Sequence, residues 1–279
     1  MVIESLGGLC MDVRDGAWSE IELTVTVKAY PAISTKHRET VCVAGIQEGL
    51  LGSANHIRLY PVPFRRLPFE ARFSKWDRIR VRVRRPRNDS RPESHSIDPS
   101  SIRVLGHLGT ERKWQARRAG VDQLHRYSMC ELQAAQKADG TSLGLVVPDE
   151  VLDFTVDARE ADEREEARRY LASRPTLFDI DEADLPLVEA IPYYFRYRFR
   201  CADCAPGKSP HHMSIIDWEI HQAYRRWRDT YGPDQVLEHL RTKWLDQICA
   251  PERETMFFTG NMHQHPGSFL VLGCWWPLR

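Results

Sequence analysis

The sequence of 279 residues contains no apolar run that approaches the roughly 20 residues of a membrane-spanning helix. This absence excludes a transmembrane protein, so we expect no membrane partner. The first ten residues also lack the basic start and the long apolar stretch of a secretory signal. We therefore expect a cytoplasmic location.

Cysteine is sparse, with seven residues, of which only Cys201 and Cys204 lie close together in the sequence. An odd number without an export signal argues against a disulfide framework. The motif G-x-x-x-x-G-K-[ST], a G-x-G-x-x-G turn opening a helix and the G-x-S-x-G elbow are also missing. Their absence disfavours P-loop nucleotide hydrolysis, a Rossmann dehydrogenase and an α/β-hydrolase.

Lysine is scarce too, with 7 residues among 39 basic ones, and acidic residues also number 39. An excess of arginine arises from a GC-rich genome, or from recognition of phosphate or carboxylate by the planar guanidinium. The net charge of zero hides an asymmetry: residues 56–118 carry 17 basic against 6 acidic residues, whereas residues 149–190 carry 14 acidic against 5 basic ones. The placement of charge therefore says more about partners than the net charge does.

The first 110 residues contain a series of short strand patterns. The clearest is residues 78–84, where three β-branched apolar residues alternate with four arginines, so that the two sets lie on opposite faces. Further strands are predicted at residues 18–30, 40–46, 56–61 and 101–105, and an exposed loop at residues 86–99. Short strands separated by Gly and Pro turns favour a small barrel or sandwich, OB-like or SH3-like, over residues 1–110.

Residues 111–279 are predicted to form a second, α+β domain, which makes the whole chain α+β. The patterns predict helices over residues 114–137, 158–173, 215–230 and 233–248. They predict strands at residues 142–147, 151–156, 193–201, 254–259 and 268–276. The helix over 158–173 is rich in Glu and Arg and is expected to be a solvated surface helix.

Two rows of arginine are the first candidate site. Strand alternation places side chains about 6–7 Å apart along one face, close to the spacing of phosphates along a nucleic-acid strand. Neighbouring aromatic residues favour a single strand of DNA or RNA, because bases stack on such rings. The alternative is a solvated outer face whose arginines pair with acidic residues. The candidate residues are Arg78, Arg80, Arg82 and Arg84 in the first row, and Arg196, Arg198 and Arg200 in the second.

A cluster of cysteine and histidine over residues 201–212 is the second candidate site. Cys201, Cys204, His211 and His212 offer thiolate and imidazole, the ligand types that zinc prefers, and the two-residue gap lets both cysteines bind one ion. We expect a structural zinc that staples this loop. Alternatively, His263 or His265 supplies a ligand, or the loop holds no metal.

The start of the predicted helix at residue 217 is the third candidate site. Asp217, Glu219 and His221 would hold Mg²⁺ or Mn²⁺ and activate a water, with His263 as acid or base. The alternative is routine: Asp217 caps the helix, and His221 is an ordinary surface residue.

These patterns favour a nucleic-acid-binding protein, a subunit or accessory factor of a larger bacterial assembly for nucleic-acid processing or defence. A metal-dependent nuclease and a protein–protein scaffold are the alternatives, so the sequence leaves open whether the protein is an enzyme. The expected partners are nucleic acid and other protein subunits, and the expected cofactor is zinc.

Overall fold

The computed structural model describes residues 16–34, 38–49, 53–160 and 189–279. The N-terminal part is built of β-strands that alternate between apolar and polar side chains, as the sequence predicts. In β5 every second residue is buried and every arginine between them is exposed. The elements of this part are β1 (Ser19–Lys28), β2 (Ala32–Ser34), β3 (Arg38–Glu48), β4 (Ala54–Val62), β5 (Asp77–Arg84), β6 (Ser94–Ile97) and β7 (Arg103–His107).

Five of these strands close into a barrel in the order β1-β3-β4-β6-β5, with β5 pairing back onto β1. If the five barrel strands are numbered in chain order, their order around the ring is first, second, third, fifth and fourth. The third and fifth strands, β4 and β6, run parallel. This closed five-stranded arrangement is consistent with an OB-like barrel. Its interior is filled by aliphatic side chains from β1, β3, β4 and β5, and by Phe73.

One barrel strand, β6, which lies between β4 and β5, is formed where the sequence predicts a loop. β6 occupies part of residues 86–99, and the predicted last strand, residues 101–105, forms β7 instead, which pairs with β5 outside the ring. The loop prediction was wrong at this point because β6 is only four residues long. Only its end residues, Ser94 and Ile97, are buried, so it carries almost no apolar signal.

The C-terminal part contains two further sheets and several helices. One sheet has the strand order β14-β13-β9-β8 and the other the order β10-β11-β12. Its strands are β8 (Arg126–Tyr127), β9 (Leu143–Val146), β10 (Glu150–Ala158), β11 (Tyr193–Arg200), β12 (His211–Ser214), β13 (Met256–Asn261) and β14 (Phe269–Trp275). Its helices are α1 (Glu111–Val121), α2 (Met129–Asp139), α4 (Trp218–Tyr231) and α5 (Pro233–Arg241), and α5 continues as a π-helix over Thr242–Gln247.

The helix predicted over residues 114–137 is in fact two helices, and this prediction was wrong. α1 ends at Val121, and α2 begins after Ser128, whose side chain accepts a hydrogen bond from the backbone N–H of Glu131 while the Glu131 carboxylate accepts one from the N–H of Ser128. Such a capping box starts a new helix in the middle of a helical pattern. The charged helix predicted over residues 158–173 lies almost entirely outside the described residues.

A shared core joins the barrel to the first C-terminal sheet. Ala44 and Ile46 of β3 pack in one apolar cluster with Leu145, Phe258 and Trp275 from β9, β13 and β14. The second half of β1 is consequently buried on both faces, one toward the barrel interior and one toward this sheet. The outer face of β3 is therefore covered by the C-terminal part rather than open to solvent.

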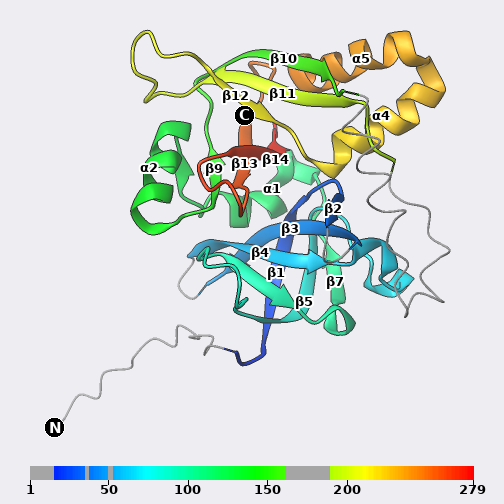
Figure 1. Cartoon of the computed structure of the whole chain (residues 1–279), viewed down its shortest axis with the longest axis vertical. Coiled ribbons are helices and arrows are strands. Elements are labelled where there is room, and N and C mark those ends of the chain that lie inside the picture. Colours follow the sequence, from blue (N-terminus) through cyan, green and yellow to red (C-terminus); the bar gives the residue numbers. More distant parts are fainter. Residues whose placement is uncertain (1–15, 35–37, 50–52, 161–188) are drawn as a thin grey trace.

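A second core lies between the two C-terminal sheets and the helices. Tyr197 of β11 stacks on Phe257 of β13, and Phe199 meets the same ring edge to face. Helices α4 and α5 contribute further apolar residues. In Figure 1 the molecule is thus layered: the barrel lies at one end, the sheet with β9, β13 and β14 in the middle, and the β10-β11-β12 sheet with α4 and α5 at the other end. Among the described residues, no helix is long and apolar enough to span a membrane.

Candidate metal centre and nucleic-acid interface

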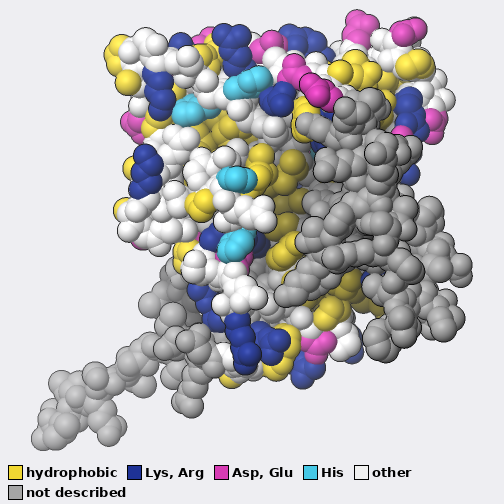
Figure 2. Space-filling model, in the orientation of Figure 1, with side chains coloured by type: hydrophobic (Ala, Val, Ile, Leu, Met, Phe, Trp, Pro, Cys, Tyr) yellow, Lys and Arg dark blue, Asp and Glu magenta, His cyan; other side chains and the backbone are white. Residues whose placement is uncertain are grey.

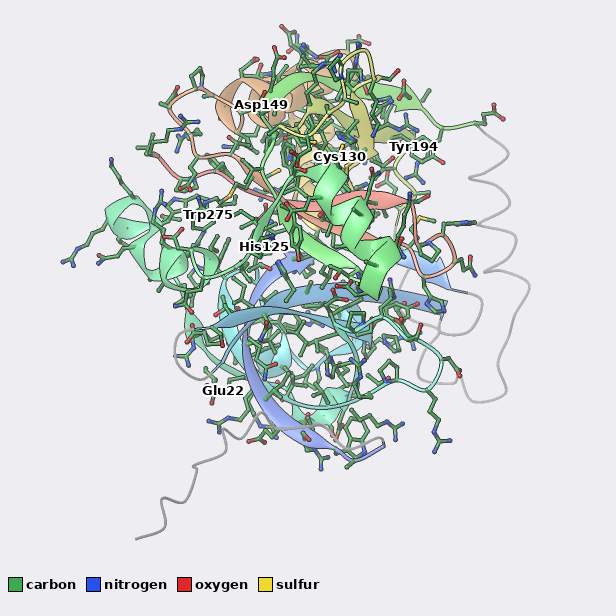
Figure 3. The ribbon with its side chains drawn as sticks, turned by 90° about the vertical axis from the view of Figure 1, so that its left-hand side faces the viewer. Glu22, His125, Cys130, Asp149, Tyr194 and Trp275 are labelled. Atoms are coloured by element: carbon green, nitrogen blue, oxygen red, sulfur yellow. The ribbon has the colours of Figure 1, made fainter. Side chains whose placement is uncertain are left out.

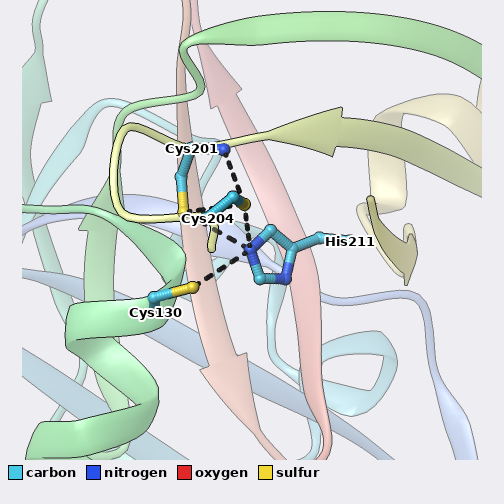
Figure 4. A group of neighbouring side chains, drawn as sticks. All are labelled: Cys130, Cys201, Cys204 and His211. Carbon is cyan, nitrogen blue, oxygen red and sulfur yellow. Dashed lines mark hydrogen bonds between the residues drawn. The ribbon is translucent and has the colours of Figure 1, made fainter. Parts of the chain in front are cut away.

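Four side chains from three different elements converge at one end of β11. Cys201 follows this strand directly, and a tight turn, in which the N–H of Cys204 donates to the carbonyl of Cys201, brings the second cysteine back beside the first. His211 is the first residue of β12, which pairs with β11. Cys130 comes from the first turn of α2, as Figure 4 shows.

The distances within this group fit a single tetrahedral metal ion. The Nε2 of His211 lies 3.3 Å from the Sγ of Cys201, 3.3 Å from that of Cys204 and 3.7 Å from that of Cys130. The Sγ atoms of Cys201 and Cys204 are 3.5 Å apart, and all four atoms lie within 4.8 Å of one another. Ligands held about 2.0–2.3 Å from a zinc ion are roughly 3.5–3.8 Å from one another in a tetrahedron. This Cys3His cluster could therefore hold a metal ion.

The surroundings of the cluster favour the ligand form that a metal needs at two of the four residues, Cys201 and His211. Burial opposes ionisation of Cys201, but hydrogen bonds from the backbone of Cys130 and from Cys204 lower its pKa. Burial and the nearby Lys208 lower the pKa of His211, which favours the neutral imidazole. The ammonium of Lys208 lies 3.7 Å from the Sγ of Cys130 and offsets part of the charge of three thiolates. Burial raises the pKa of Cys130 to about 11, so a metal would have to displace its proton.

His212 is not part of this cluster, which corrects one predicted ligand. Successive residues of a strand point to opposite faces, so His211 faces the cysteines while His212 faces away, where its Nε2 lies 3.0 Å from the Oγ1 of Thr155. His263 and His265, in the loop between β13 and β14, also lie outside the cluster. Cys130 takes the fourth place. Nothing in the local sequence around Cys130 marks it as a ligand, because its approach to Cys201 depends on how α2 packs.

The first arginine row is exposed along β5, and carboxylates of neighbouring strands accompany it. Arg78 and Arg80 pair with Glu22 of β1, at 3.1 and 2.6 Å, and Arg80 also lies 3.7 Å from Glu20. Arg82 pairs with Asp98. The guanidinium of Arg84 lies 4.6 Å from the ring centre of Trp18, whose residue is 42% exposed. The row is therefore an outward-facing line of guanidinium groups, as nucleic-acid binding requires, and it also has acidic partners, as a solvated outer face would.

The second arginine row lies on the outer face of β11. Arg196 pairs with Asp157 of β10 and lies beside the ring of Tyr194. Arg198 is exposed with no ion-pair partner in the described part of the chain, and Arg200 donates to the carbonyl of Lys208 at 3.1 Å. The acidic segment 149–190, expected to pair with these arginines, is largely outside the described residues.

The two rows lie at opposite ends of the molecule. Figure 3 shows Glu22, the partner of the first row, at the barrel end and Tyr194, beside the second row, at the far end. On the face in Figure 2, Lys and Arg side chains gather near both ends, mixed with Asp and Glu over the upper end. The structure therefore does not bring the rows together into one continuous track.

The predicted nuclease residues do not converge on a common point. Asp217 and Glu219 both bind the ammonium of Lys75, at 3.0 and 2.9 Å, and Asp217 also caps α4. The buried imidazole of His221 faces elsewhere: its Nδ1 lies 2.7 Å from the carbonyl oxygen of Asp217, and its ring stacks on Tyr30. His263 lies 3.5 Å from Asp89 in the barrel. Here Lys75 occupies the place that a metal ion would take between the carboxylates.

Comparison with known proteins gives family membership. No curated protein matches the chain. Among solved structures, a replication protein A heterotrimer bound to single-stranded DNA is similar at 11% identity and a TM-score of 0.25, over 96% of this chain and 67% of that one. So low a TM-score bears on neither fold nor function. The family model described as Domain of unknown function (DUF8758) matches residues 19–123, which contain the barrel. The model described as Domain of unknown function (DUF8757) matches residues 125–279, more than half of the chain, and the chain therefore belongs to this family.

Proposed function

We propose that this protein binds nucleic acid and that a single strand follows the outer face of β5. The observation that carries the proposal is the row Arg78, Arg80, Arg82 and Arg84, four exposed guanidinium groups in line on a rigid barrel strand. Residues of one strand face repeat about every 6–7 Å, which allows each arginine to meet a successive phosphate. Trp18, at the end of this row, offers a partly exposed ring for a base.

The acidic partners of the row do not stand against this proposal. Arg80 and Glu22 are both about half exposed, and exposed ion pairs contribute about 0–1 kcal/mol because water screens them and ordering two side chains costs entropy. A phosphodiester strand can therefore replace these carboxylates at modest cost. Their presence predicts weaker binding than an unpaired row would give, because the carboxylates compete with phosphate for the guanidinium groups, and this competition is strongest at low salt.

The location on β5 also follows from what the rest of the barrel leaves open. OB folds bind oligonucleotides through their second and third strands and through the loops after the first and fourth strands. Here the second strand, β3, is covered by the C-terminal sheet. The fourth strand is β5, and the loop after it contains the exposed Arg87, which has no partner among the described residues. The open side of the barrel is thus the side that carries the arginine row.

The test is the affinity for fluorescent single-stranded oligonucleotides, DNA and RNA, across a series of KCl concentrations. Binding through phosphates predicts that the logarithm of the affinity falls linearly with the logarithm of the salt concentration. A double variant, Arg80→Ala with Arg82→Ala, should weaken binding to all sequences alike and make that slope shallower by roughly two phosphate contacts. The matched control, Arg196→Ala with Arg198→Ala, removes the same charge from the opposite end and should leave the affinity within twofold.

Two results would contradict the proposal. An affinity that does not change with salt would exclude binding through phosphates. A loss of binding in the Arg196 and Arg198 variant alone would place the strand on β11 instead of β5.

We further propose that the Cys3His cluster holds one structural zinc ion. Three cysteines and one histidine fill a tetrahedral site completely, which is typical of structural rather than catalytic zinc. The ion would tie α2 to the ends of β11 and β12 and so hold the second arginine row in register. Elemental analysis of untagged protein should find about one equivalent of zinc, and a protein without zinc would contradict this assignment.

A further inference from the structure

A cavity of about 460 Å³ lies where the barrel, α1 and the C-terminal part meet, and its lining includes no residue of either arginine row or of the Cys3His cluster. Its size is within the usual range for sites that take small molecules. Three of its walls are tryptophan side chains, Trp76, Trp114 and Trp276. The other lining residues are Lys75, His107, Thr110, Arg117, Glu219, Arg253 and Cys274.

The tryptophans and arginines of this cavity are interleaved. The guanidinium of Arg117 lies 4.7 Å from the ring centre of Trp76 and 4.8 Å from that of Trp114. On the other side, the guanidinium of Arg253 lies 5.0 Å from the ring centre of Trp276. The rings of Trp114 and Trp276 are 5.5 Å apart and meet edge to face. Planar aromatic walls with guanidinium groups between them suit a ligand that is both flat and negatively charged.

The charges in the cavity also favour an anion. The ammonium of Lys75 is bound by Asp217 and Glu219, so these carboxylates are already neutralised in part. Arg117 is only 8% exposed, and its Nε donates to the carbonyl of Leu108, yet its two terminal nitrogens have no hydrogen-bond partner in the described part of the chain. The buried Nε of Arg253 likewise has no partner among those residues. Buried guanidinium nitrogens without a hydrogen-bond acceptor are costly, and a bound anion would relieve that cost.

The backbone around the cavity is held in an unusual conformation. Trp76 has a φ of 70°, and Trp114 has a φ of 64°, in the left-handed region that bulky residues rarely adopt. Arg112 and Lys113, just before Trp114, share this conformation. Residues in such conformations persist only where the surrounding packing fixes them, and they cluster at active sites and ligand-binding sites. Both strained tryptophans line the same cavity.

We infer that this cavity binds a nucleotide, with the base against the tryptophan walls and the phosphate at Arg117 and Arg253. A nucleoside phosphate combines a flat ring system with a doubly charged group, the two properties that the lining selects. The same chemistry is offered by a free nucleoside monophosphate and by the phosphorylated end of a strand. Only the strand-end form rests on the function proposed above, because the cavity and the β5 row share no residue.

The cavity draws its walls from both family segments. Residues 19–123 supply Trp76, Trp114 and Arg117, while residues 125–279 supply Arg253 and Trp276. The site is therefore complete only when both segments are folded against each other. The experiment accordingly uses the full chain.

The test is calorimetric titration of the full-length protein with the four ribonucleoside 5′-monophosphates, with the matching nucleosides and with inorganic phosphate. We expect a monophosphate to bind at least tenfold more tightly than its nucleoside and than inorganic phosphate. Arg117→Met should weaken that binding at least tenfold. The matched control is Arg118→Met, the next residue of α1, which pairs with Glu254 outside the cavity and should leave binding within twofold. If Arg117→Met does not fold, as judged by circular dichroism, Arg253→Met and Trp276→Leu carry the same expectation.

The remaining measurements distinguish a free nucleotide from the phosphorylated end of a strand, and they distinguish this cavity from the β5 row. Competition by a 5′-phosphorylated oligonucleotide, but not by its unphosphorylated form, would identify a strand end. Competition by neither would identify a free nucleotide. The Arg80 and Arg82 variant should bind the monophosphate normally, so a failure of the β5 row leaves this site standing. Equal binding of inorganic phosphate and nucleotide, or no binding of any monophosphate to the wild-type protein, would overturn the inference.

Discussion

The Nζ of Lys75 lies 3.0 Å from a carboxylate oxygen of Asp217, and less than a tenth of either side chain is exposed. Lys75 precedes β5 of the barrel, and Asp217 caps α4 in the C-terminal part, so one buried ion pair joins two segments 142 residues apart. Glu219 completes the arrangement at 2.9 Å. Burial alone would lower the pKa of Lys75, but the carboxylates of Asp217 and Glu219 raise it above its ordinary value. Burial raises the pKa of Asp217 to about 6, which is still below neutrality, so both groups are charged at neutral pH.

Replacing Lys75 by Met should destabilise the protein strongly. The variant leaves the Asp217 carboxylate buried without its cation, and removal of one partner of a buried pair costs about 3–5 kcal/mol. Urea unfolding followed by circular dichroism measures this loss. The double variant Lys75→Met with Asp217→Asn removes both charges and should recover much of the lost stability. A double variant no more stable than Lys75→Met would show that the carboxylate is not the source of the cost.

The stability of the protein should fall as the pH is lowered from 6.5 toward 4. Burial, assisted by the nearby Arg58, lowers the pKa of His56 to about 4, and burial lowers the pKa of His221 to about 4 as well. Each imidazole is neutral in the folded protein but takes up a proton in the unfolded chain below about pH 6.5. The stabilisation is therefore complete above that pH and is lost as the pH falls toward 4, by about 1.4 kcal/mol per pH unit for each group.

Variants of single histidines test this pH dependence. The Nε2 of His56 is buried without a partner in the described residues. His56→Leu therefore removes the titrating group without breaking a hydrogen bond to that nitrogen. Between pH 7.5 and pH 5, this variant should lose about 2 kcal/mol less unfolding free energy than the wild type. The control is His265→Leu, at an exposed position, which should follow the wild type. Parallel pH curves for His56→Leu and the wild type would refute the prediction.

The sequence predicts those parts of the fold that rest on local patterning. β5 alternates strictly because one face fills the barrel and the other meets water, and this pattern is visible without a structure. Burial does not alternate at the end of β1: Thr26, Val27 and Lys28 are all buried, and Val27 packs in the cluster that the barrel shares with the C-terminal part. β6 escaped prediction for a related reason, since its place in the barrel depends on pairing with β4 and β5 rather than on its own composition. Contacts between distant segments thus decide what local patterns do not.

The same division applies to the metal centre. Cys201, Cys204 and His211 lie within eleven residues, so their spacing alone suggests a shared ion. The choice between His211 and His212 needed the strand register, which pairs Phe199 with His211 and Arg198 with His212. Cys130 lies far away in sequence and reaches the cluster because the capping box at Ser128 fixes where α2 starts. A nuclease activity and a place in a larger assembly both stay predictions.

Cys130→Ser should weaken zinc binding, because it removes a fourth ligand from a closed tetrahedral site. The binding free energy of structural zinc is also folding free energy, so the variant should lower both the metal affinity, by about tenfold or more, and the melting temperature. Competition with a chromophoric chelator measures the affinity, and thermal unfolding measures the stability. His212→Asn is the control, since His212 faces Thr155 outside the cluster. Wild-type zinc affinity in Cys130→Ser would remove Cys130 from the ligand set.

Replacing Glu22 by Gln should strengthen nucleic-acid binding. Glu22 accepts hydrogen bonds from both Arg78 and Arg80, and the contact with Arg80 lowers the pKa of this carboxyl group, so it is charged at neutral pH and competes with phosphate for the guanidinium groups. Removing its charge while keeping its size should raise the affinity for a single strand by about two- to fivefold at 50 mM KCl, and by less at 300 mM KCl because salt screens the competing charge. Asp157→Asn, which frees Arg196 on the other row in the same way, is the control and should change the affinity less than twofold. Equal gains in both variants would mean that only the overall charge matters, and a gain in Asp157→Asn alone would move the bound strand from the barrel to β11.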